Sequence, residues 1–546
     1  MNKLLLSAAV TAAMFAGNAQ AALQLTGGAP DLTNALTQTV KEVWISGSSA
    51  ATPFVEKSVA ADCTGTVYKY ANSTNDFTWV CDSSIATSTI NIVHKRDGGG
   101  SVTAIKSALA AATPALAATY LPTYWTTASL AASATAGTTT CAASSTSNGV
   151  AVTVCTPTGA SAVQHNADID LADVDGAQFE SAANGGVANA SSLSATKGLA
   201  TQVFGIVVNT RLYAAMQVAS VAAGKIASSC IGGITPGASS FNTPTNNTDA
   251  CMPSLTTAQL SAILGNNRAT DWYNLYFTDT TGAQNSLVTV QNIADQPANT
   301  DVHYCSRTAG SGTLATINIK LENQCSKTNE AFATANAQTI NPEVDATTGN
   351  QKVVHSMSGS GDLENCLEGL NDGVTKATFT LPTLISTGNA SASVANARWA
   401  IGIMGLDRNS TVAKKYRFIK VDGFAPTAQN VVEGKYKIWA ELVNVAATST
   451  NPLALDILAN LGSASQITAL NVTHPFGLSG FLGTANNTNF PPSYDAAIAP
   501  GTKLYAAWDA ARPVNPWTHT TSTGNALNHC RTPSIPTGGQ VAIPTF

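Results

Sequence analysis

Apolar runs alternate with helix-periodic stretches along most of the chain. The runs that predict buried strands are residues 41–45, 89–94, 202–209, 398–406 and 434–445, with 287–293 as a further candidate. The stretches with helical periodicity begin at residue 55 or span 102–109, 210–223, 255–265, 314–321, 363–370 and 452–461. Strands that alternate with helices in this way predict an α/β protein with mostly parallel sheets.

Three of the predicted strand-to-helix turns are rich in glycine and hydroxyl residues. They are residues 46–54, residues 95–101 and the stretch from Arg307 to Thr313. At a helix start the free backbone N–H groups attract an anion. In the third turn Ser311 and Thr313 add hydroxyl donors, and the Arg307 guanidinium can form bidentate, charge-assisted hydrogen bonds to an anion. Taken alone, this motif is more simply explained by a glycine-rich turn with an N-cap and a surface arginine, and only the other motifs of the chain favour the anion site.

The first residues of the chain indicate where the protein is located. Residues 1–21 have a positive end at Lys3, an apolar centre and a small-residue cleavage site, which predicts a secretory signal. No later apolar run is long enough to span a bilayer, so we expect a periplasmic or secreted protein. Charged residues make up 11% of the chain and the net charge is −5, which gives no electrostatic reason to expect nucleic acid or an anionic membrane as partner.

The chain has ten cysteines, all beyond the signal. In an exported protein disulfides are the default, although sequence alone cannot fix their connectivity. Pairing close neighbours predicts Cys63–Cys81, Cys141–Cys155, Cys230–Cys251, Cys305–Cys325 and, by remainder, Cys366–Cys530. The second pair lies in an Ala/Thr/Ser-rich stretch at about residues 110–162, which we expect to be a surface insertion pinned by that disulfide.

The ordered turns resemble motifs of the periplasmic phosphate-binding proteins of ABC importers, which have the type II periplasmic-binding fold. The arginine motif from Arg307 to Thr313 is similar to that family's Arg-x-Asp-Gly-Ser-Gly-Thr. The turns at residues 47–51 and 97–102 resemble its entry and glycine-rich loops, and residues 168–173 resemble its Asp-Phe-Gly-Ala-Ser-Asp. Residues 255–272 and 422–427 resemble two later motifs, so the likeness covers most of residues 40–460.

The resemblance implies two lobes that close on an oxyanion and are joined by two crossing strands near residues 203–209 and 436–445. Residues 22–208 would form the first part of lobe 1, residues 209–435 lobe 2, and residues 436–546 the returning strand, a helix and a C-terminal extension. Asp173 would accept the proton of monohydrogen phosphate, and Arg307 would meet both Asp173 and the ligand. The implied ligand-binding residues are Ser48, Ser49, Ala51, Thr52, Gly98, Gly99, Gly100, Ser101, Asp173, Arg307, Ser311, Gly312 and Thr313.

Three positions depart from the family pattern. Ala309 stands where the family has an acid, and Ser101 is displaced from the usual place of a ligand serine. The hydroxyl and aromatic of the entry loop are either shifted by one residue or lost. Each of these changes weakens the case for free phosphate, whereas the retained Asp173 and Arg307 support it. We therefore expect an oxyanion, with phosphate as the leading candidate. An ABC permease, or further copies of the chain at the cell surface, are the expected macromolecular partners.

Other readings of the sequence remain open. The size, the insertion and the unmatched tail also suit an exported surface, matrix or filament protein that reuses the fold. No Gly-x-Ser-x-Gly elbow is present, and His94 and His303 are scattered, so we expect no enzyme activity and no cofactor. The acids at residues 168–175 lack the glycine of an EF-hand loop, and His529 beside Cys530 is more simply part of a disulfide region, so the sequence predicts no metal site.

Overall fold

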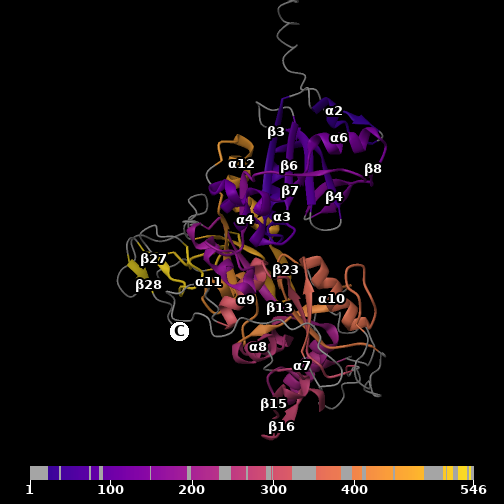
Figure 1. The fold of residues 1–546 in the computed structure, drawn as a ribbon. Coiled ribbons are helices and arrows are strands. Elements are labelled where there is room, and N and C mark those ends of the chain that lie inside the picture. The colour runs from indigo at the N-terminus through magenta and orange to yellow at the C-terminus, as the bar shows by residue number, and fades with distance from the viewer. Residues whose placement is uncertain are drawn as a thin grey trace, which may run out of the picture.

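The computed structural model has two halves stacked end to end (Figure 1). It describes residues 23–542 except 27, 36–38, 73–75, 85–89, 148, 194–197, 233–246, 266–268, 290–296, 298, 323–351, 383–395, 409–412, 447–448, 485–507, 512, 521–526 and 538–539. The predicted signal at residues 1–21 lies outside the described residues.

A 16-stranded sheet runs through both halves. From one edge to the other its main path is β18 (Val353–Met357), β17 (His303–Arg307), β19 (Ala400–Gly405), β13 (Ala200–Asn209), β22 (Trp439–Asn444), β12 (Ile169–Ala172), β3 (Val40–Gly47), β6 (Ile90–Arg96), β5 (Asp76–Ser83), β4 (Cys63–Asn72), β10 (Val150–Pro157) and β8 (Thr139–Cys141). Each half has a parallel core, because β3 pairs in parallel with β6 and β12, and β17 with β18 and β19. The predicted α/β class is confirmed.

Two long strands connect the halves. β13 pairs with β22 through residues 200–203 and with β19 through residues 204–208, and β22 continues to β12 in the other half. All of these pairings are antiparallel. Every residue of β13 is buried, which explains its unbroken apolar sequence. β13 and β22 are therefore the crossing strands of this fold.

Helices cover the faces of the sheet. The bounds of the predicted helices follow the sequence prediction closely, whereas the helix at residues 464–470 was not predicted. The helices are α3 (Thr52–Ala61), α4 (Ser101–Ala112), α7 (Thr210–Ala222), α8 (Thr257–Leu264), α9 (Gly312–Glu322), α10 (Ser360–Asp372), α12 (Pro452–Leu461) and α13 (Ala464–Leu470). Side chains of Asn209, Thr256 and Asn451 cap α7, α8 and α12. The residues before α3 and α4, Ala51 and Gly100, give no side-chain cap.

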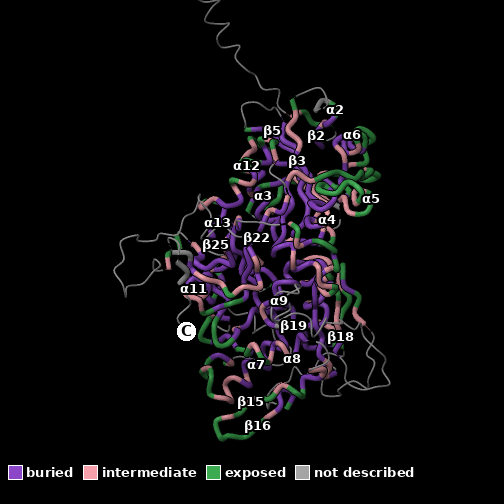
Figure 2. Tube along the Cα trace, turned by 60° about the vertical axis from the view of Figure 1, so that its left-hand side comes forward, coloured by how far each residue is buried: buried purple, intermediate pink, exposed green. Residues whose placement is uncertain are grey.

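Two stretches differ from the sequence prediction. Residues 287–289 form a short 3-10 helix rather than the start of a strand. In the Ala/Thr/Ser-rich insertion, β10 pairs in parallel with β4, and its Val152 and Cys155 are buried. The insertion therefore extends the sheet instead of only decorating the surface. Figure 2 shows the buried stretches running through both halves.

The C-terminal region returns to the first half and the crossing strands. α12 and α13 bury Leu453, Ile457 and Ile467, and β25 (Phe481–Thr484) pairs with β13. No single described helix is long and apolar enough to cross a membrane; α12 and α13 meet that test only as a pair bent by 60°.

Four disulfides join described cysteines. Cys63–Cys81, Cys141–Cys155 and Cys230–Cys251 confirm three predicted pairs. The fourth is Cys305–Cys366, so the predicted pairs Cys305–Cys325 and Cys366–Cys530 are wrong. The physical reason is packing: α10 lies against β17 and brings Cys366 to Cys305, although 61 positions separate them. Cys530 is also disulfide-bonded, and Cys325 lies outside the described residues.

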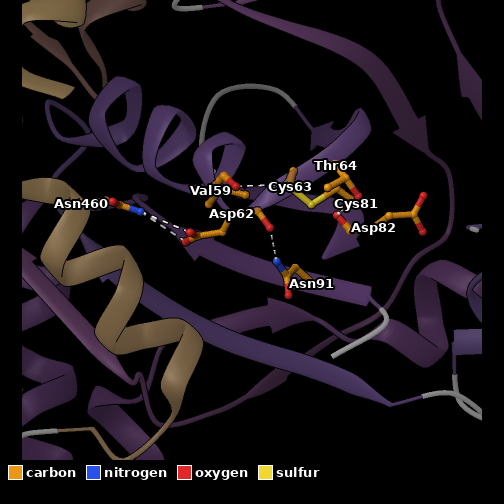
Figure 3. Close-up of a disulfide and its surroundings, with 8 residues drawn as sticks. All are labelled: Val59, Asp62, Cys63, Thr64, Cys81, Asp82, Asn91 and Asn460. Carbon is orange, nitrogen blue, oxygen red and sulfur yellow. Dashed lines mark hydrogen bonds between the residues drawn. A yellow bond between two sulfur atoms is a disulfide. The ribbon is translucent and has the colours of Figure 1, made fainter. Parts of the chain in front are cut away.

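The Cys63–Cys81 disulfide lies where the end of α3, the strands β4 to β6 and the helix α12 come together (Figure 3). It joins β4 to β5 just after α3 ends. The main-chain oxygen of Asp62 accepts a hydrogen bond from Asn91 of β6 at 2.7 Å, and Asn460 of α12 reaches the Asp62 carboxylate at 3.4 Å. The bridge and these bonds fix the C-terminal end of α3 on the sheet.

Candidate functional site

The polar residues of the candidate site stand at the carboxyl ends of neighbouring strands. β3, β6 and β12 are parallel, so their carboxyl ends meet at one edge of the sheet. Ser48 follows β3, Asp97 follows β6 and Asp173 follows β12. Arg307 is the last residue of β17 in the other half. This is the edge at which open α/β sheets bind their ligands.

Asp173 is the centre of a buried hydroxyl cluster in the first half. The Ser48 hydroxyl donates to Asp173 Oδ1, and the Asp173 main-chain N–H donates to Ser101 Oγ at 3.1 Å. The Ala51 N–H donates to Ser48 Oγ at 3.1 Å. Burial raises the pKa of the Asp173 carboxyl, while the Ser48 hydrogen bond and the positive charges of Arg307 and Lys95 act against that rise.

Arg307 reaches from the second half into the first. Its side chain is 1% exposed, and its Nη2 donates to Ser49 Oγ at 3.0 Å and to the Ser358 main-chain oxygen at 2.8 Å. Its Nε donates to the Met357 main-chain oxygen at 3.3 Å. These hydrogen bonds go to Ser49, Ser358 and Met357 rather than to the Asp173 carboxylate, which Arg307 influences through its charge. The arginine is thus held rigidly at the boundary between the halves.

The starts of α4 and α9 face each other across the same boundary. The Val102 N–H donates to the Gly310 main-chain oxygen at 2.9 Å. A Cβ atom on Gly312 would lie 2.5 Å from Asp173 Oδ2, closer than real contacts allow. Gly100 has a φ of 71°, and a Cβ there would lie 3.1 Å from Ser311 Cα. Glycine fits these positions because Gly100 packs against the backbone at Gly310 and Ser311, and Gly312 packs against the side chains of Ser101 and Asp173.

Lys95 and Asp97 also belong to this region, although neither was among the ligand residues predicted from the sequence. Lys95, 1% exposed, donates from Nζ to the Ser48 main-chain oxygen at 3.0 Å and lies 3.4 Å from Asp97 Oδ2. Thr52 Oγ1 donates to Asp97 Oδ2 at 2.7 Å, and within the described residues Asp97 Oδ1 has no hydrogen-bond partner although it is buried. Burial raises the pKa of Asp97 against the opposing effect of Lys95. A lysine at the end of a buried strand, directly before the glycine loop, is the signal that could have found it.

The structure brings most of the predicted ligand residues together. Ser48, Ser49, Ser101, Asp173, Arg307 and Gly312 are linked by the contacts above, and Ser311 and Thr313 are buried beside them. Ala51 contributes its main-chain N–H to Ser48, and Thr52 binds Asp97. Gly99 is exposed and Gly98 partly exposed, so this part of the loop faces away. Ala309 is also exposed, which places the missing acid of the family motif outside the buried cluster.

Comparison with known proteins gives structural neighbours only. No protein-family model matches the chain, and no curated protein matches it. The chain is similar in structure to phosphate-binding proteins of ABC transporters. One is a putative phosphate ABC transporter substrate-binding protein with bound phosphate from Clostridium perfringens, at TM-score 0.36 and 12% identity over 78% of this chain and 96% of that one.

Two further neighbours are of the same kind. PstS from Borrelia burgdorferi has TM-score 0.30 and 11% identity, and an ABC-type phosphate transport receptor from Vibrio cholerae has TM-score 0.29 and 10% identity. Each covers 79% of this chain and 96% of its own. Because the TM-scores of these three structures lie below 0.5, the proposed function rests on the contacts of the candidate site and on the motifs of the sequence.

Proposed function

We propose that this chain is an exported solute-binding protein that closes on a tetrahedral oxyanion, with phosphate as the leading ligand. The observation that carries the proposal is the position of Arg307. The second half supplies this buried cation, and the first half supplies Ser48, Ser49 and Asp173 around it. A charged donor and hydroxyls at one boundary are what an oxyanion requires.

The helix starts support the same ligand class. α3, α4 and α9 begin at this boundary, and the residues before α3 and α4 bring no side-chain acceptor for the first-turn N–H groups. Other helices of the chain, such as α7, α8 and α12, do carry such caps. The Val102 N–H of α4 donates to the Gly310 main-chain oxygen, and in α9 the Leu314 N–H donates to Ser311 Oγ at 3.4 Å. The N–H groups at the starts of α3 and α4 that lack a side-chain acceptor, together with the helix dipole, favour an anion over a neutral solute.

In this proposal Asp173 makes the site select phosphate over sulfate. A buried carboxylate beside the anion accepts a hydrogen bond from a protonated ligand oxygen and repels a fully deprotonated one. Monohydrogen phosphate carries such a proton at neutral pH, whereas sulfate does not, so an unpaired acceptor would penalise sulfate. Burial raises the pKa of Asp173, whereas the Ser48 hydrogen bond and the charges of Arg307 and Lys95 favour the ionised carboxylate that this discrimination needs.

The expected partner is an ABC-type permease that receives phosphate from this protein outside the cytoplasm. The rival is an exported surface or filament protein that has kept the fold. The insertion and the C-terminal region, which the resemblance does not cover, favour that second function. However, β10 and β25 pair with other strands of the sheet rather than projecting from it.

An equilibrium titration tests the proposal. The mature protein is purified under oxidising conditions, stripped of ligand by partial unfolding and refolding, and titrated with phosphate beside sulfate. We expect phosphate to bind with micromolar or tighter affinity and sulfate to give no signal. Binding of neither anion by protein with its native circular dichroism would contradict the proposal and favour the surface role.

A further inference from the structure

Two histidines of the C-terminal region meet a glutamate of the crossing strand β22 in the protein interior. His519 Nδ1 lies 2.6 Å from Glu441 Oε2, and His529 Nε2 lies 3.2 Å from the same oxygen. The two imidazole rings have their centroids 5.0 Å apart. The side chains of all three residues are 0% exposed.

We propose that Glu441, His519 and His529 bind one divalent transition-metal ion of the zinc class. Their three ligand atoms lie within 4.8 Å of one another. Bonds of about 2.0–2.1 Å to zinc place tetrahedral ligand atoms about 3.3 Å apart. The His529–Glu441 pair already has this spacing, and the His519–Glu441 pair reaches it by a small side-chain shift. Imidazole nitrogens with one carboxylate favour zinc-class ions over magnesium or calcium.

The surroundings of the three ligands fit a metal site. The Nδ1 atom of His529 lies 3.0 Å from Asp175 Oδ2, and a carboxylate on the far nitrogen is the usual way to orient a metal-binding histidine. The His519 main-chain N–H donates to Glu441 Oε1 at 2.9 Å, which fixes the glutamate and leaves its other oxygen for the ion. Asp175 and Glu441 are both buried carboxylates, and a dication between them offsets their charge.

One cation also faces the cluster. Lys320 Nζ of α9 lies 2.7 Å from His519 Nε2, on the side of the ring away from Glu441. His529 Nε2 also accepts a hydrogen bond from the Glu441 main-chain N–H at 3.2 Å, which a bound ion would replace. Without an ion, hydrogen bonds alone would connect Asp175, His529, Glu441, His519 and Lys320 in a chain. The two arrangements differ in a measurable way, because only the first depends on metal.

The residues of the site come from three parts of the sequence that are far apart and meet in the folded chain. Glu441 is on a crossing strand, Asp175 follows β12, and both histidines come from the region after β26 (Val514–Asn515). Because the ion binds only the assembled ligands, its binding free energy adds to folding stability. A bound metal would hold the C-terminal region on the crossing strand, and this inference does not depend on which anion the protein binds.

Metal content tests the inference directly. The full mature chain, without a histidine tag, is incubated with zinc in phosphate-free buffer, freed of loose ions by gel filtration, and assayed by elemental mass spectrometry. We expect about one zinc per chain. The double variant His519→Gln/His529→Gln should hold almost none. The matched control His474→Gln removes another buried histidine, which bonds to the Leu406 main-chain oxygen, and should keep the metal. Equal zinc in the wild type and the double variant would overturn the inference.

A second measurement on the wild-type chain covers the case in which the double variant fails to fold. We expect the unfolding temperature to fall after treatment with a chelator and to recover after one equivalent of zinc is added. Cobalt added in its place should give the visible absorption of a tetrahedral site. An unfolding temperature that neither treatment changes, with no cobalt absorption, would show that the residues form a metal-free hydrogen-bonded chain.

Discussion

The Nη2 atom of Arg307 lies 3.0 Å from the hydroxyl of Ser49, although 258 positions separate the two residues in the sequence. Ser49 belongs to the turn after β3 in the first half, and Arg307 ends β17 in the second. The contact joins the halves at the carboxyl edge of the sheet, where the starts of α3, α4 and α9 meet. A guanidinium whose Nη2 shares its hydrogen bonds between a hydroxyl and a main-chain oxygen can exchange the weaker partner for an anion.

Replacing Arg307 should strongly weaken anion binding without unfolding the chain. Arg307→Gln keeps much of the side-chain volume but loses the charge, and hydrogen bonds to charged groups contribute about 1.5–3 kcal/mol. We expect phosphate affinity to fall by about 10- to 100-fold or more. Titration calorimetry measures the affinity, and circular dichroism checks the fold. Arg307→Lys keeps the charge but cannot form two parallel hydrogen bonds, so its phosphate affinity should lie between those of the wild type and Arg307→Gln. Unchanged affinity in Arg307→Gln would show that the site has been misplaced.

A methyl group at Gly312 should separate the two halves at the site. Gly312→Ala places a Cβ atom 2.5 Å from Asp173 Oδ2, so the start of α9 must withdraw from Asp173. We expect phosphate affinity to fall more than about tenfold because the closed arrangement is strained. The matched control is Gly361→Ala in the first turn of α10, where an added Cβ meets nothing within 4 Å. That variant should bind normally and be at most slightly more stable. Equal binding by both variants would contradict the close packing at Gly312.

Asp170 should make stability fall as pH rises towards neutrality. Burial raises the pKa of this carboxyl to about 7, with the nearby Asp168 adding to the rise and the Ser46 hydrogen bond opposing it. From about pH 4 to about pH 7 the folded state holds a proton that the unfolded state releases, so the free energy of unfolding decreases across that window. Asp170→Asn removes this contribution.

Urea unfolding at several pH values measures the effect of Asp170→Asn. Other buried acids, including Asp62, whose pKa burial and Asp456 raise to about 6, contribute to the slope of both proteins. The difference between wild type and variant isolates Asp170. We expect the variant to gain stability relative to the wild type as pH rises from about 4 to about 7. Parallel pH profiles would refute the role given to Asp170.

The Cys305–Cys366 disulfide should support both stability and binding. It encloses a 61-residue separation, for which chain entropy predicts a loss of about 4 kcal/mol when both cysteines become alanine. Cys305 lies two positions before Arg307, so phosphate affinity should fall as well. The comparison is Cys141→Ala/Cys155→Ala, with a separation of 14, which should cost about 3 kcal/mol but leave affinity unchanged. Denaturant unfolding and calorimetry separate the two readouts, and an affinity loss in both variants would argue against a local role.

The sequence predicted the strand-to-helix turns and the arginine motif because each is a local pattern. Glycine and serine at a helix start, and an apolar run before it, are visible within ten or so residues. The meeting of Ser49 with Arg307 came only from the resemblance, because no local pattern carries a contact between such distant positions. The lobe boundaries at residues 208 and 435 stay predictions, although β13 and β22 cross between the halves close to them.

Tertiary packing explains the errors. Pairing cysteines by closeness in sequence held for Cys63–Cys81 and Cys141–Cys155 on adjacent strands and for Cys230–Cys251 between two short 3-10 helices. It was wrong for Cys305, because α10 brings Cys366 onto β17. Lys95 was passed over as part of a turn, since its burial depends on Ser48 and Asp97 arriving from other strands. The Glu441, His519 and His529 cluster has no sequence signature, because its members come from regions 78 and more positions apart.

The most direct test of the account compares the wild type with Asp173→Asn in titrations with phosphate and with sulfate. The substitution keeps the shape of the side chain but turns an obligate acceptor into a group that can also donate. We predict that the wild type binds phosphate and ignores sulfate, whereas the variant loses this discrimination through weaker phosphate binding, measurable sulfate binding, or both. An unchanged preference for phosphate in the variant would contradict the central claim that Asp173 selects a protonated oxyanion at this boundary.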